Sequence, residues 1–433
     1  MNRIARIEGS ARLLALVKLA NVGLVMLWGF AVTFVFVRVL PIAEFQAFLL
    51  LVAFGNFTIS AEFGLTSIVY ARLRRHWLGG EGEGADGGFR LEEMGVLFLF
   101  LGLLIAGALA ILLVALASGA LATAMPLLFL LFFLSACLNL PALLAKRALA
   151  AVDGNFLWEA LDCGRRVVTI GLLLAILAGL DARVSVALQL AVSVAVIGHA
   201  LAHVHRRLGM TRRHWTAFRA GGGHVRAHYL RDIGASAAFT VSDIVAYNAP
   251  YFTIAAVTSD PRPMLVFDFF FKMSRSLSML VRAMVEAALP RITRAYHAGE
   301  TTRLRQLLGR AMGAAMAFAA ALAAVLWGAG DRLFALLFDG RAAIDRADLV
   351  LILLALGALT LLCVSVYVQA ALGRFSHLLA RSLPFLAGSL ASAPLAAALW
   401  PRRFDLAFLG LYALTLCTVA GLHLLSLRRL ARA

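Results

Sequence analysis

The sequence is poor in charge. Charged residues make up 15% of the 433 positions, whereas hydrophobic residues make up 62% and the mean hydropathy is +0.89. A soluble globular protein carries about 25% charged residues, so the composition excludes a soluble domain of the ordinary kind. We therefore expect a polytopic membrane protein.

Cysteine and long polar loops are also scarce. The four cysteines show no metal-ligand spacing, and we interpret them as small apolar residues. The Gly-rich stretch 79–88 is not followed by Lys-Ser/Thr, so it predicts a linker rather than a phosphate-binding loop. The largest outer loop that we predict, residues 330–348, is too short to hold a catalytic domain. We expect no metal, no cofactor and no enzyme activity.

Long apolar runs fill most of the chain. Runs of about 17 to 25 residues cross the roughly 30 Å hydrocarbon core as helices. We predict twelve such spans, at residues 13–37, 45–70, 94–117, 119–144, 167–180, 184–204, 233–257, 264–289, 311–329, 348–372, 383–399 and 406–426. The fifth is the shortest, and an earlier start stays open. The predicted fold class is an all-α membrane protein.

Positive charge is unevenly distributed over the predicted loops. The chain has 40 Lys and Arg against 23 Asp and Glu, a formal net charge of +17. If the N-terminus is inside, 28 of the 40 cations lie in inner segments, 8 in outer loops and 4 within spans. The positive-inside rule then places both termini in the cytoplasm. No continuous basic domain is present, so we expect no nucleic-acid partner.

A weak internal repeat divides the chain. Gly154-Asn155-Phe156 matches Gly373-Arg374-Phe375 at an offset of 219 residues, which is half the chain. The repeat predicts two six-helix lobes, residues 1–204 and 233–433, joined by a basic cytoplasmic linker at 205–232. A pseudo-two-fold along the membrane normal would relate the lobes and leave a central cavity between them. Chance similarity of short Ala/Leu/Gly strings is the alternative.

The predicted eighth span, "DFFFKMSRSLSMLVRAMVEAALP", carries five ionisable residues. Their spacing of 4, 3, 7 and 4 puts them on one helical face, whereas Phe270 lies elsewhere and is expected to face lipid. They are Asp268, Lys272, Arg275, Arg282 and Glu286. Charges within a span face a bundle interior or an aqueous cavity. Three cations against two anions suit an anionic group such as a diphosphate.

A structural interpretation of the same five residues stays open. Asp268 with Lys272, and Arg282 with Glu286, are spaced to form ion pairs along the helix. Arg275 has no acidic residue three or four positions away. If the two pairs form, Arg275 is therefore the residue that lacks a partner on its own helix.

Two other spans offer polar partners. On the seventh, Asp243, Tyr247 and Tyr251 share one face with Asn248 beside it, a surface that suits sugar hydroxyls or that joins helices as a polar seam. On the second, Glu62 lies at about the depth of Arg282 and is predicted to pair with it across a cleft. Glu62 and Asp243 are either protonation or sodium sites, or counter-ions to the cations.

Several motifs resemble a known family. Arg38-Val39-Leu40, Glu44-Phe45 and Glu62-Phe63-Gly64, with "ALPRITRAYHAGETTRLRQLLGRA" at 288–311, resemble the polysaccharide-biosynthesis flippases. These O-antigen and oligosaccharide-lipid flippases belong to the multidrug/oligosaccharidyl-lipid/polysaccharide exporter superfamily. Gln46 replaces the glycine of the first motif, and Glu62 replaces the aspartate of the second.

The resemblance implies a two-lobed flippase of the bacterial inner membrane. Its cargo would be a polyprenyl-diphosphate-linked oligosaccharide for lipopolysaccharide or exopolysaccharide synthesis, moved by alternating access. Membrane lipids, a polysaccharide polymerase and glycosyltransferases are the expected partners. A multidrug antiporter on the same fold is the first alternative, although it predicts an acid-dominated cavity. A membrane enzyme of glycan assembly is the second, although the predicted outer loops are short.

Overall fold

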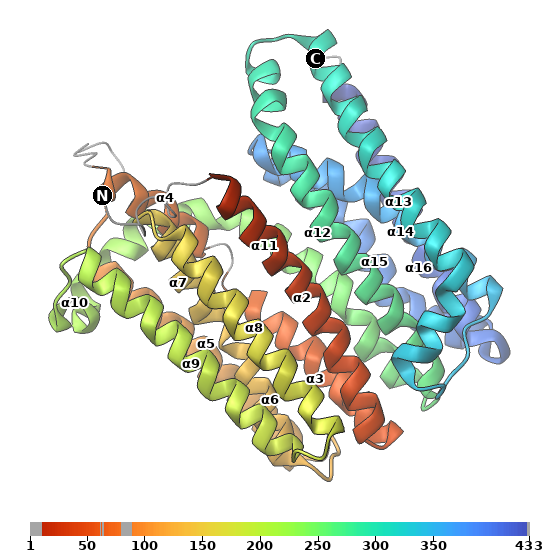
Figure 1. Cartoon of the computed structure of the whole chain (residues 1–433). Helices are drawn as coiled ribbons and strands as arrows, with labels where there is room; N and C mark the ends of the chain where they lie inside the picture. Colours follow the sequence, from red (N-terminus) through yellow and green to blue (C-terminus); the bar gives the residue numbers. More distant parts are fainter. Residues whose placement is uncertain (1–10, 61, 63–64, 79–88, 431–433) are drawn as a thin grey trace. The chain divides into compact units, whose positions relative to one another are not determined.

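The computed structural model describes residues 11–60, 62, 65–78 and 89–430, and these form helices and turns with no strand among them (Figure 1). The predicted all-α class is therefore confirmed. Nine of the helices in this part of the chain are long and apolar enough to cross a membrane. The predicted fifth, seventh and eighth spans are helices too, but they carry more polar or charged residues.

The chain divides into two compact units, and each is described by itself. Unit 1 comprises Met1–Leu40 and Phe54–Ala237, and unit 2 comprises Pro41–Ala53 and Ala238–Ala433. The helices up to the boundary are α2 (Ala11–Val39), α3 (Ile42–Ser60), α4 (Leu65–Trp77), α5 (Glu92–Ala117), α6 (Pro126–Cys137), α7 (Asn139–Ala151), α8 (Asn155–Leu177), α9 (Ala182–Arg207) and α10 (Arg212–Thr216). Helix α11 (Phe218–Val257) contains the boundary at Ala237, and α3 contains another at Ala53.

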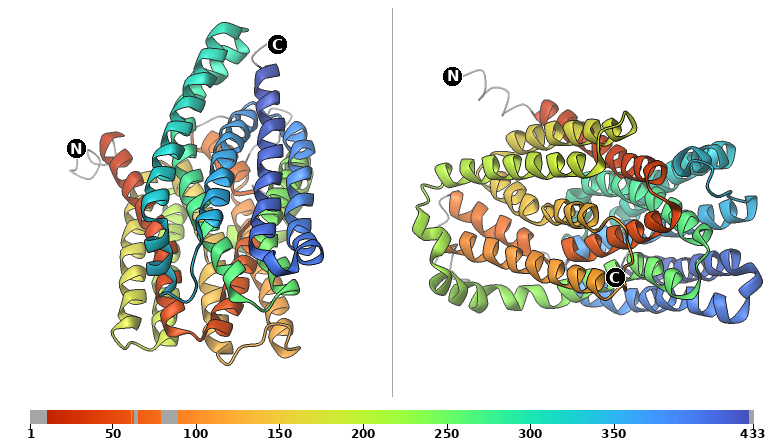
Figure 2. Two further views of the ribbon diagram at one scale, coloured as in Figure 1. Left: turned by 90° about the vertical axis from the view of Figure 1, so that its right-hand side faces the viewer. Right: turned by 90° about the horizontal axis from the view of Figure 1, so that it is seen from below.

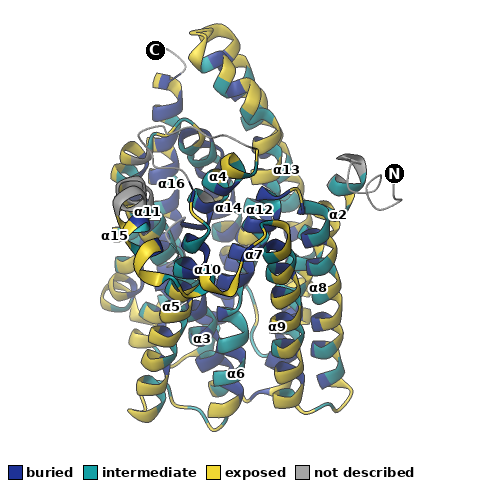
Figure 3. Cartoon of the chain, turned by 90° about the vertical axis from the view of Figure 1, so that its left-hand side faces the viewer, coloured by how far each residue is buried: buried dark blue, intermediate teal, exposed yellow. Residues whose placement is uncertain are grey.

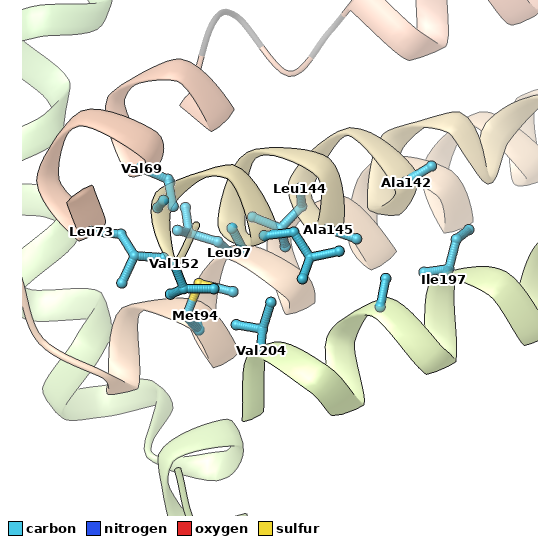
Figure 4. Packing of buried hydrophobic residues seen from close by; sticks show 14 of the residues in the cluster. Val69, Leu73, Met94, Leu97, Ala142, Leu144, Ala145, Val152, Ile197 and Val204 are labelled. Carbon is cyan, nitrogen blue, oxygen red and sulfur yellow. The ribbon is translucent and has the colours of Figure 1, made fainter. Parts of the chain in front are cut away.

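Unit 1 packs small and branched residues between its helices. Val69 of α4, Met94 of α5, Leu144 of α7 and Val204 of α9 belong to one buried cluster (Figure 4). Its members on α9 recur every three or four residues, so one face of that helix is buried and the other exposed (Figure 3). In lipid, such close packing rather than the hydrophobic effect joins helices.

The predicted linker 205–232 is largely helical. It holds the end of α9, all of α10 and the start of α11. Helix α10 lies directly on α5, because a Cβ added at Gly95 would stand 2.6 Å from the backbone oxygen of Trp215. Glycine at position 95 therefore lets the two backbones approach.

Unit 2 is built on two unusually long helices. The remaining elements are α12 (Pro261–His297), α13 (Thr301–Phe338), α14 (Arg346–Ala371), α15 (Phe375–Leu399), the short 3₁₀ helix η1 (Pro401–Arg403) and α16 (Phe404–Leu430). Helices α12 and α13 have 37 and 38 residues, where about 20 suffice to span a bilayer. Their connecting turn extends past the neighbouring ends of α14 and α15 (Figure 2).

Three predicted spans differ most from the observed helices. The fourth was predicted at 119–144, but α6 begins at Pro126 and a break at Leu138 separates it from α7. The fifth was placed at 167–180, but α8 begins at Asn155, so four charged residues lie inside the helix. The second was predicted as one helix, but α3 ends at Ser60 and α4 begins at Leu65. Both repeat tripeptides do mark helix starts, since Gly154 is the N-cap of α8 and Arg374 the N-cap of α15.

Candidate functional site

Helix α12 buries its apolar residues inside unit 2. It packs against α13, α14 and α16, and Phe267, Phe270 and Val281 are at most 1% exposed. The prediction that Phe270 faces lipid is wrong, because its ring lies against Tyr412 with the ring centroids 5.6 Å apart. The apolar residues of α12 are therefore covered by protein, whereas Arg275, Arg282 and Glu286 of its charged face are exposed.

Two of the predicted charged residues form a buried ion pair with each other. Asp268 is 1% exposed, forms an ion pair with Lys272 and accepts a hydrogen bond of 2.7 Å from the Tyr251 hydroxyl. Tyr251 comes from α11 and is itself buried. This arrangement satisfies the carboxylate from two sides, and it joins α11 to α12 rather than presenting a charge to a ligand.

The other predicted pair is open to solvent. Arg282 donates to Glu286 at 2.7 Å, and both side chains are more than half exposed. The guanidinium of Arg282 also lies 5.8 Å from the ring centroid of Tyr367 on α14. Both of the ion pairs that the structural interpretation predicts are therefore present. A ligand-binding role for the five charged residues stays a prediction.

Arg275 is exposed and forms no ion pair with any described residue. Its guanidinium lies 5.6 Å from the ring centroid of Phe271 and interacts electrostatically with Asp243 of α11. Counting Asp243, the polar face of α11 and α12 has three cations and three anions. The predicted excess of positive charge on α12 is therefore cancelled when the neighbouring helix is included.

Asp243 lies among tyrosines. Tyr247 stacks edge-on against Phe385 of α15 with ring centroids 5.0 Å apart. Tyr247 and Tyr412 both interact electrostatically with the Asp243 carboxylate, and the buried Tyr412 hydroxyl has no hydrogen-bond partner among the described residues. Asp243 and Tyr247 are only partly buried, so they combine a negative charge with accessible aromatic faces.

Asn248 does not contribute to that surface. It is 4% exposed, and its side-chain amide donates 2.9 Å to the backbone oxygen of Ile244 in its own helix. Sequence reasoning missed Tyr367 and Tyr412, which α14 and α16 bring to the same place. Each is a tyrosine within a predicted apolar span, and this is the sequence signal that could have marked both as candidate site residues.

Glu62 lies in the break between α3 and α4. Its carboxylate accepts the backbone N–H of Thr66 at 2.8 Å, which satisfies one of the free donors at the start of α4. This contact gives Glu62 a local structural role. Glu62 belongs to unit 1 and Arg282 to unit 2, and their predicted pairing stays a prediction.

Unit 1 contains a buried ionic cluster that sequence reasoning did not find. Asp162 of α8 accepts hydrogen bonds from Arg165 and Arg166 on its own helix, the shortest at 2.6 Å. The Asn21 amide of α2 donates to Asp162 at 3.0 Å and to Glu159 at 2.7 Å. Asn21 also accepts from Arg166 at 3.1 Å.

Both carboxylates of the cluster have cationic partners. Lys146 of α7 stands 3.5 Å from Glu159 and supplies a further positive charge. Asp162 and Glu159 are each 4% exposed, yet both have donors on other residues. Because the predicted fifth span began at residue 167, these groups were assigned to a solvated loop. We interpret the cluster as a link between α2, α7 and α8.

Comparison with known proteins decides the fold. No protein-family model matches the chain, and a search of curated proteins found no match. Among solved structures, an inward-facing multidrug resistance MATE family transporter of the MOP superfamily superposes with a TM-score of 0.66 and 14% identity, over 96% of this chain and 98% of that one. The chain has the MATE-transporter fold.

Further MATE structures agree. The outward-facing conformation gives a TM-score of 0.63 at 15% identity, over 97% of this chain and 94% of that one. A mutant of the Vibrio cholerae MATE transporter VcmN gives 0.61 at 17% identity, over 97% and 96%. The matched structures have twelve transmembrane helices in two lobes, the same numbers of spans and lobes that the sequence predicts. At these identities the match shows the fold and leaves the cargo open.

Proposed function

We propose that the chain is a membrane transporter that works by alternating access and exports amphipathic organic molecules in exchange for a cation, as a multidrug or toxin antiporter does. The MATE fold over nearly the whole chain supports a transporter rather than an enzyme. The matched structures that name a cargo class name multidrug resistance. The bacterial inner membrane and cytoplasmic termini stay predictions.

The observation that carries this proposal is the carboxylate of Asp243 beside aromatic rings. Drug-sized ligands are bound mostly by apolar and aromatic side chains with a few placed polar groups, and cations are attracted to the faces of aromatic rings. Tyr247 supplies a partly exposed ring that packs against the buried Phe385 within unit 2, and Asp243 supplies the charge.

Arg275 has a defined part in this mechanism. Of the three cations predicted on the charged face of α12, it is the one held by no ion pair, and Asp243 interacts with it electrostatically. When a cationic cargo reaches Asp243, the exposed Arg275 side chain can turn away into water, because no contact with another carboxylate restrains it. Arg275 would thus be a movable counter-ion that the cargo replaces.

Dye efflux tests the proposal. Ethidium, a monocationic aromatic dye, should be transported by everted vesicles holding the wild-type chain, and Asp243→Asn should lower the rate at least about tenfold. A hydrogen bond or contact to a charged group contributes about 1.5–3 kcal/mol, and about 1.4 kcal/mol corresponds to tenfold. The matched control is Glu286→Gln, which removes an exposed negative charge from the neighbouring helix. Wild-type efflux by Asp243→Asn at equal membrane abundance would contradict the proposal.

A lipid-linked oligosaccharide flippase is the second candidate. Arg275 and Arg282 are both exposed on one face of α12, and guanidinium groups bind phosphate oxygens in a bidentate manner. The motif resemblance at residues 37–73 and 288–311 favours the same function. A polyprenyl-diphosphate-linked oligosaccharide, with a polymerase and glycosyltransferases as partners, belongs to this candidate.

The two candidates predict opposite mutant patterns. In a flippase-deficient strain complemented by this chain, Arg275→Ala should abolish glycan export, Arg275→Lys should retain part of it, and Asp243→Asn should have little effect. The protein must be quantified in the membrane for each variant. Loss of export in Asp243→Asn with normal export in Arg275→Ala would remove the flippase from consideration.

A further inference from the structure

Three arginines converge where α15 begins and α16 ends. Arg374 is the N-cap of α15, Arg381 lies in the second turn of that helix, and Arg429 lies in the last turn of α16. The Arg381 guanidinium donates 3.4 Å to the backbone oxygen of Leu422, so it crosses the seam between the two helices. The charges of Arg374 and Arg429 both act on Arg381.

The positive charge of this arginine group is not balanced. Within the described part of the chain, none of the three arginines forms an ion pair with a carboxylate. The first turn of α15 has no acidic residue. Like charges held close together are unfavourable unless an anion lies between them. Arg165 and Arg166 of unit 1, which are partly buried, differ because Asp162 pairs with both.

An exposed aliphatic strip leads up to the arginine group. On α16, Leu414, Leu422 and Leu425 are 62%, 38% and 51% exposed. Leu425 is four residues before Arg429, so the two side chains lie on the same face of the helix. A leucine strip that ends in arginine suits acyl chains below and a phosphate above, because arginine extends its charge to the headgroup level.

We propose that the α15–α16 seam is a binding site for an anionic phospholipid. The guanidinium groups of Arg374, Arg381 and Arg429 would hold the headgroup phosphate, and the leucine strip of α16 would contact the acyl chains. This end of unit 2 is the one that the positive-inside rule places at the cytoplasmic surface. A soluble phosphate would use the arginines alone, and the leucine strip favours the lipid. The inference does not depend on which cargo is transported.

Lipid-dependent thermal stability tests this site. We expect phosphatidylglycerol to raise the melting temperature of the full chain in neutral detergent, and phosphatidylcholine to leave it unchanged. The variant Arg374→Gln/Arg381→Gln/Arg429→Gln should lose at least half of that rise. The matched control Arg303→Gln/Arg305→Gln/Arg310→Gln removes three exposed arginines from α13 and should keep it.

Three outcomes would overturn the proposal. An equal loss of the melting-temperature rise in both triple variants would mean that phosphatidylglycerol stabilises the chain through its total positive charge and not through this site. An equal rise with inorganic phosphate would mean that a soluble anion occupies the site. If the seam variant does not fold, native mass spectrometry of Arg381→Gln replaces the measurement, and retention of phosphatidylglycerol equal to wild type would count against the site. Arg381→Lys should retain most of the bound lipid.

Discussion

Helices α8 and α12 accommodate their charged residues in different ways. Each carries ionisable residues in a chain of apolar spans, but in α8 the charges of Glu159 and Asp162 are buried and matched by neighbouring donors. In α12 the buried Asp268 and Lys272 are matched in this way, whereas Arg275 and Arg282 of the same predicted group are exposed.

This difference distinguishes charges that stabilise the fold from charges that are available to a ligand. A buried, fully matched cluster has no donor or acceptor left for a ligand, and it costs stability when one member is removed. An exposed charge with no ion pair contributes little to stability and is available to a cargo. By this criterion the α8 cluster holds unit 1 together, while Arg275 and its neighbour Asp243 form the candidate site of unit 2.

The largest effect is expected from removing the centre of the α8 cluster. Asp162→Ala would leave Arg165 and Arg166 without their shared carboxylate and should destabilise unit 1 by about 3–5 kcal/mol. The measurement is the amount of monodisperse protein after solubilisation and the melting temperature. The control Glu286→Ala removes half of an exposed pair on α12 and should cost about 0.5 kcal/mol. Similar costs for the two variants would break the comparison.

The buried pair of α12 should behave like the α8 cluster on a smaller scale. Lys272→Met leaves the Asp268 carboxylate buried beside the Tyr251 hydroxyl and should cost about 3 kcal/mol. Adding Asp268→Asn removes that charge and keeps an acceptor for Tyr251, so the double variant should be more stable than Lys272→Met alone. Melting temperatures of the two single variants and the double variant measure this coupling. Additive costs would show that the two residues do not act as a pair.

The smallest effect concerns an exposed ion pair just before α8. Asp153 accepts hydrogen bonds from the Trp77 indole at 2.9 Å and from Arg74 at 2.5 Å. The Trp77 hydrogen bond and the Arg74 charge lower the pKa of Asp153 below its ordinary value. A lowered pKa means that this stabilisation is complete above about pH 3.9 and is lost as the pH falls through the pKa of the folded state.

Asp153→Asn isolates that contribution. Asp153 has a φ of 62°, which asparagine adopts as readily as aspartate, so the backbone should not change. The variant should be less stable by about 0.5 kcal/mol at pH 7, and the difference from wild type should shrink below about pH 4. Melting curves at both pH values check the prediction, and a constant difference at low pH would show that the Asp153 charge is not its source.

Much of the architecture could be predicted from the sequence. Composition and the length of apolar runs determined an all-α membrane protein, because a bilayer admits helices whose backbone groups are satisfied within the segment. The period of 3.6 residues placed the charges of α12 on one face, and Arg275 and Arg282 do share an exposed surface. The helical period gives no information about which residues of neighbouring helices lie opposite that face.

The tertiary structure alone decided which charges have partners. Asn21 and Glu159 are 138 residues apart in the sequence but hydrogen-bonded in unit 1. The charges of Asp243 and Arg275 interact only because α11 lies beside α12. Helical periodicity gives the direction of a side chain within its own helix and carries no information about the neighbouring helix. Hydropathy adds the cost of each charge separately, so it started the fifth span only after the charges of Glu159 and Asp162. The fold supplies partners for these charges by bringing α2 and α7 against α8.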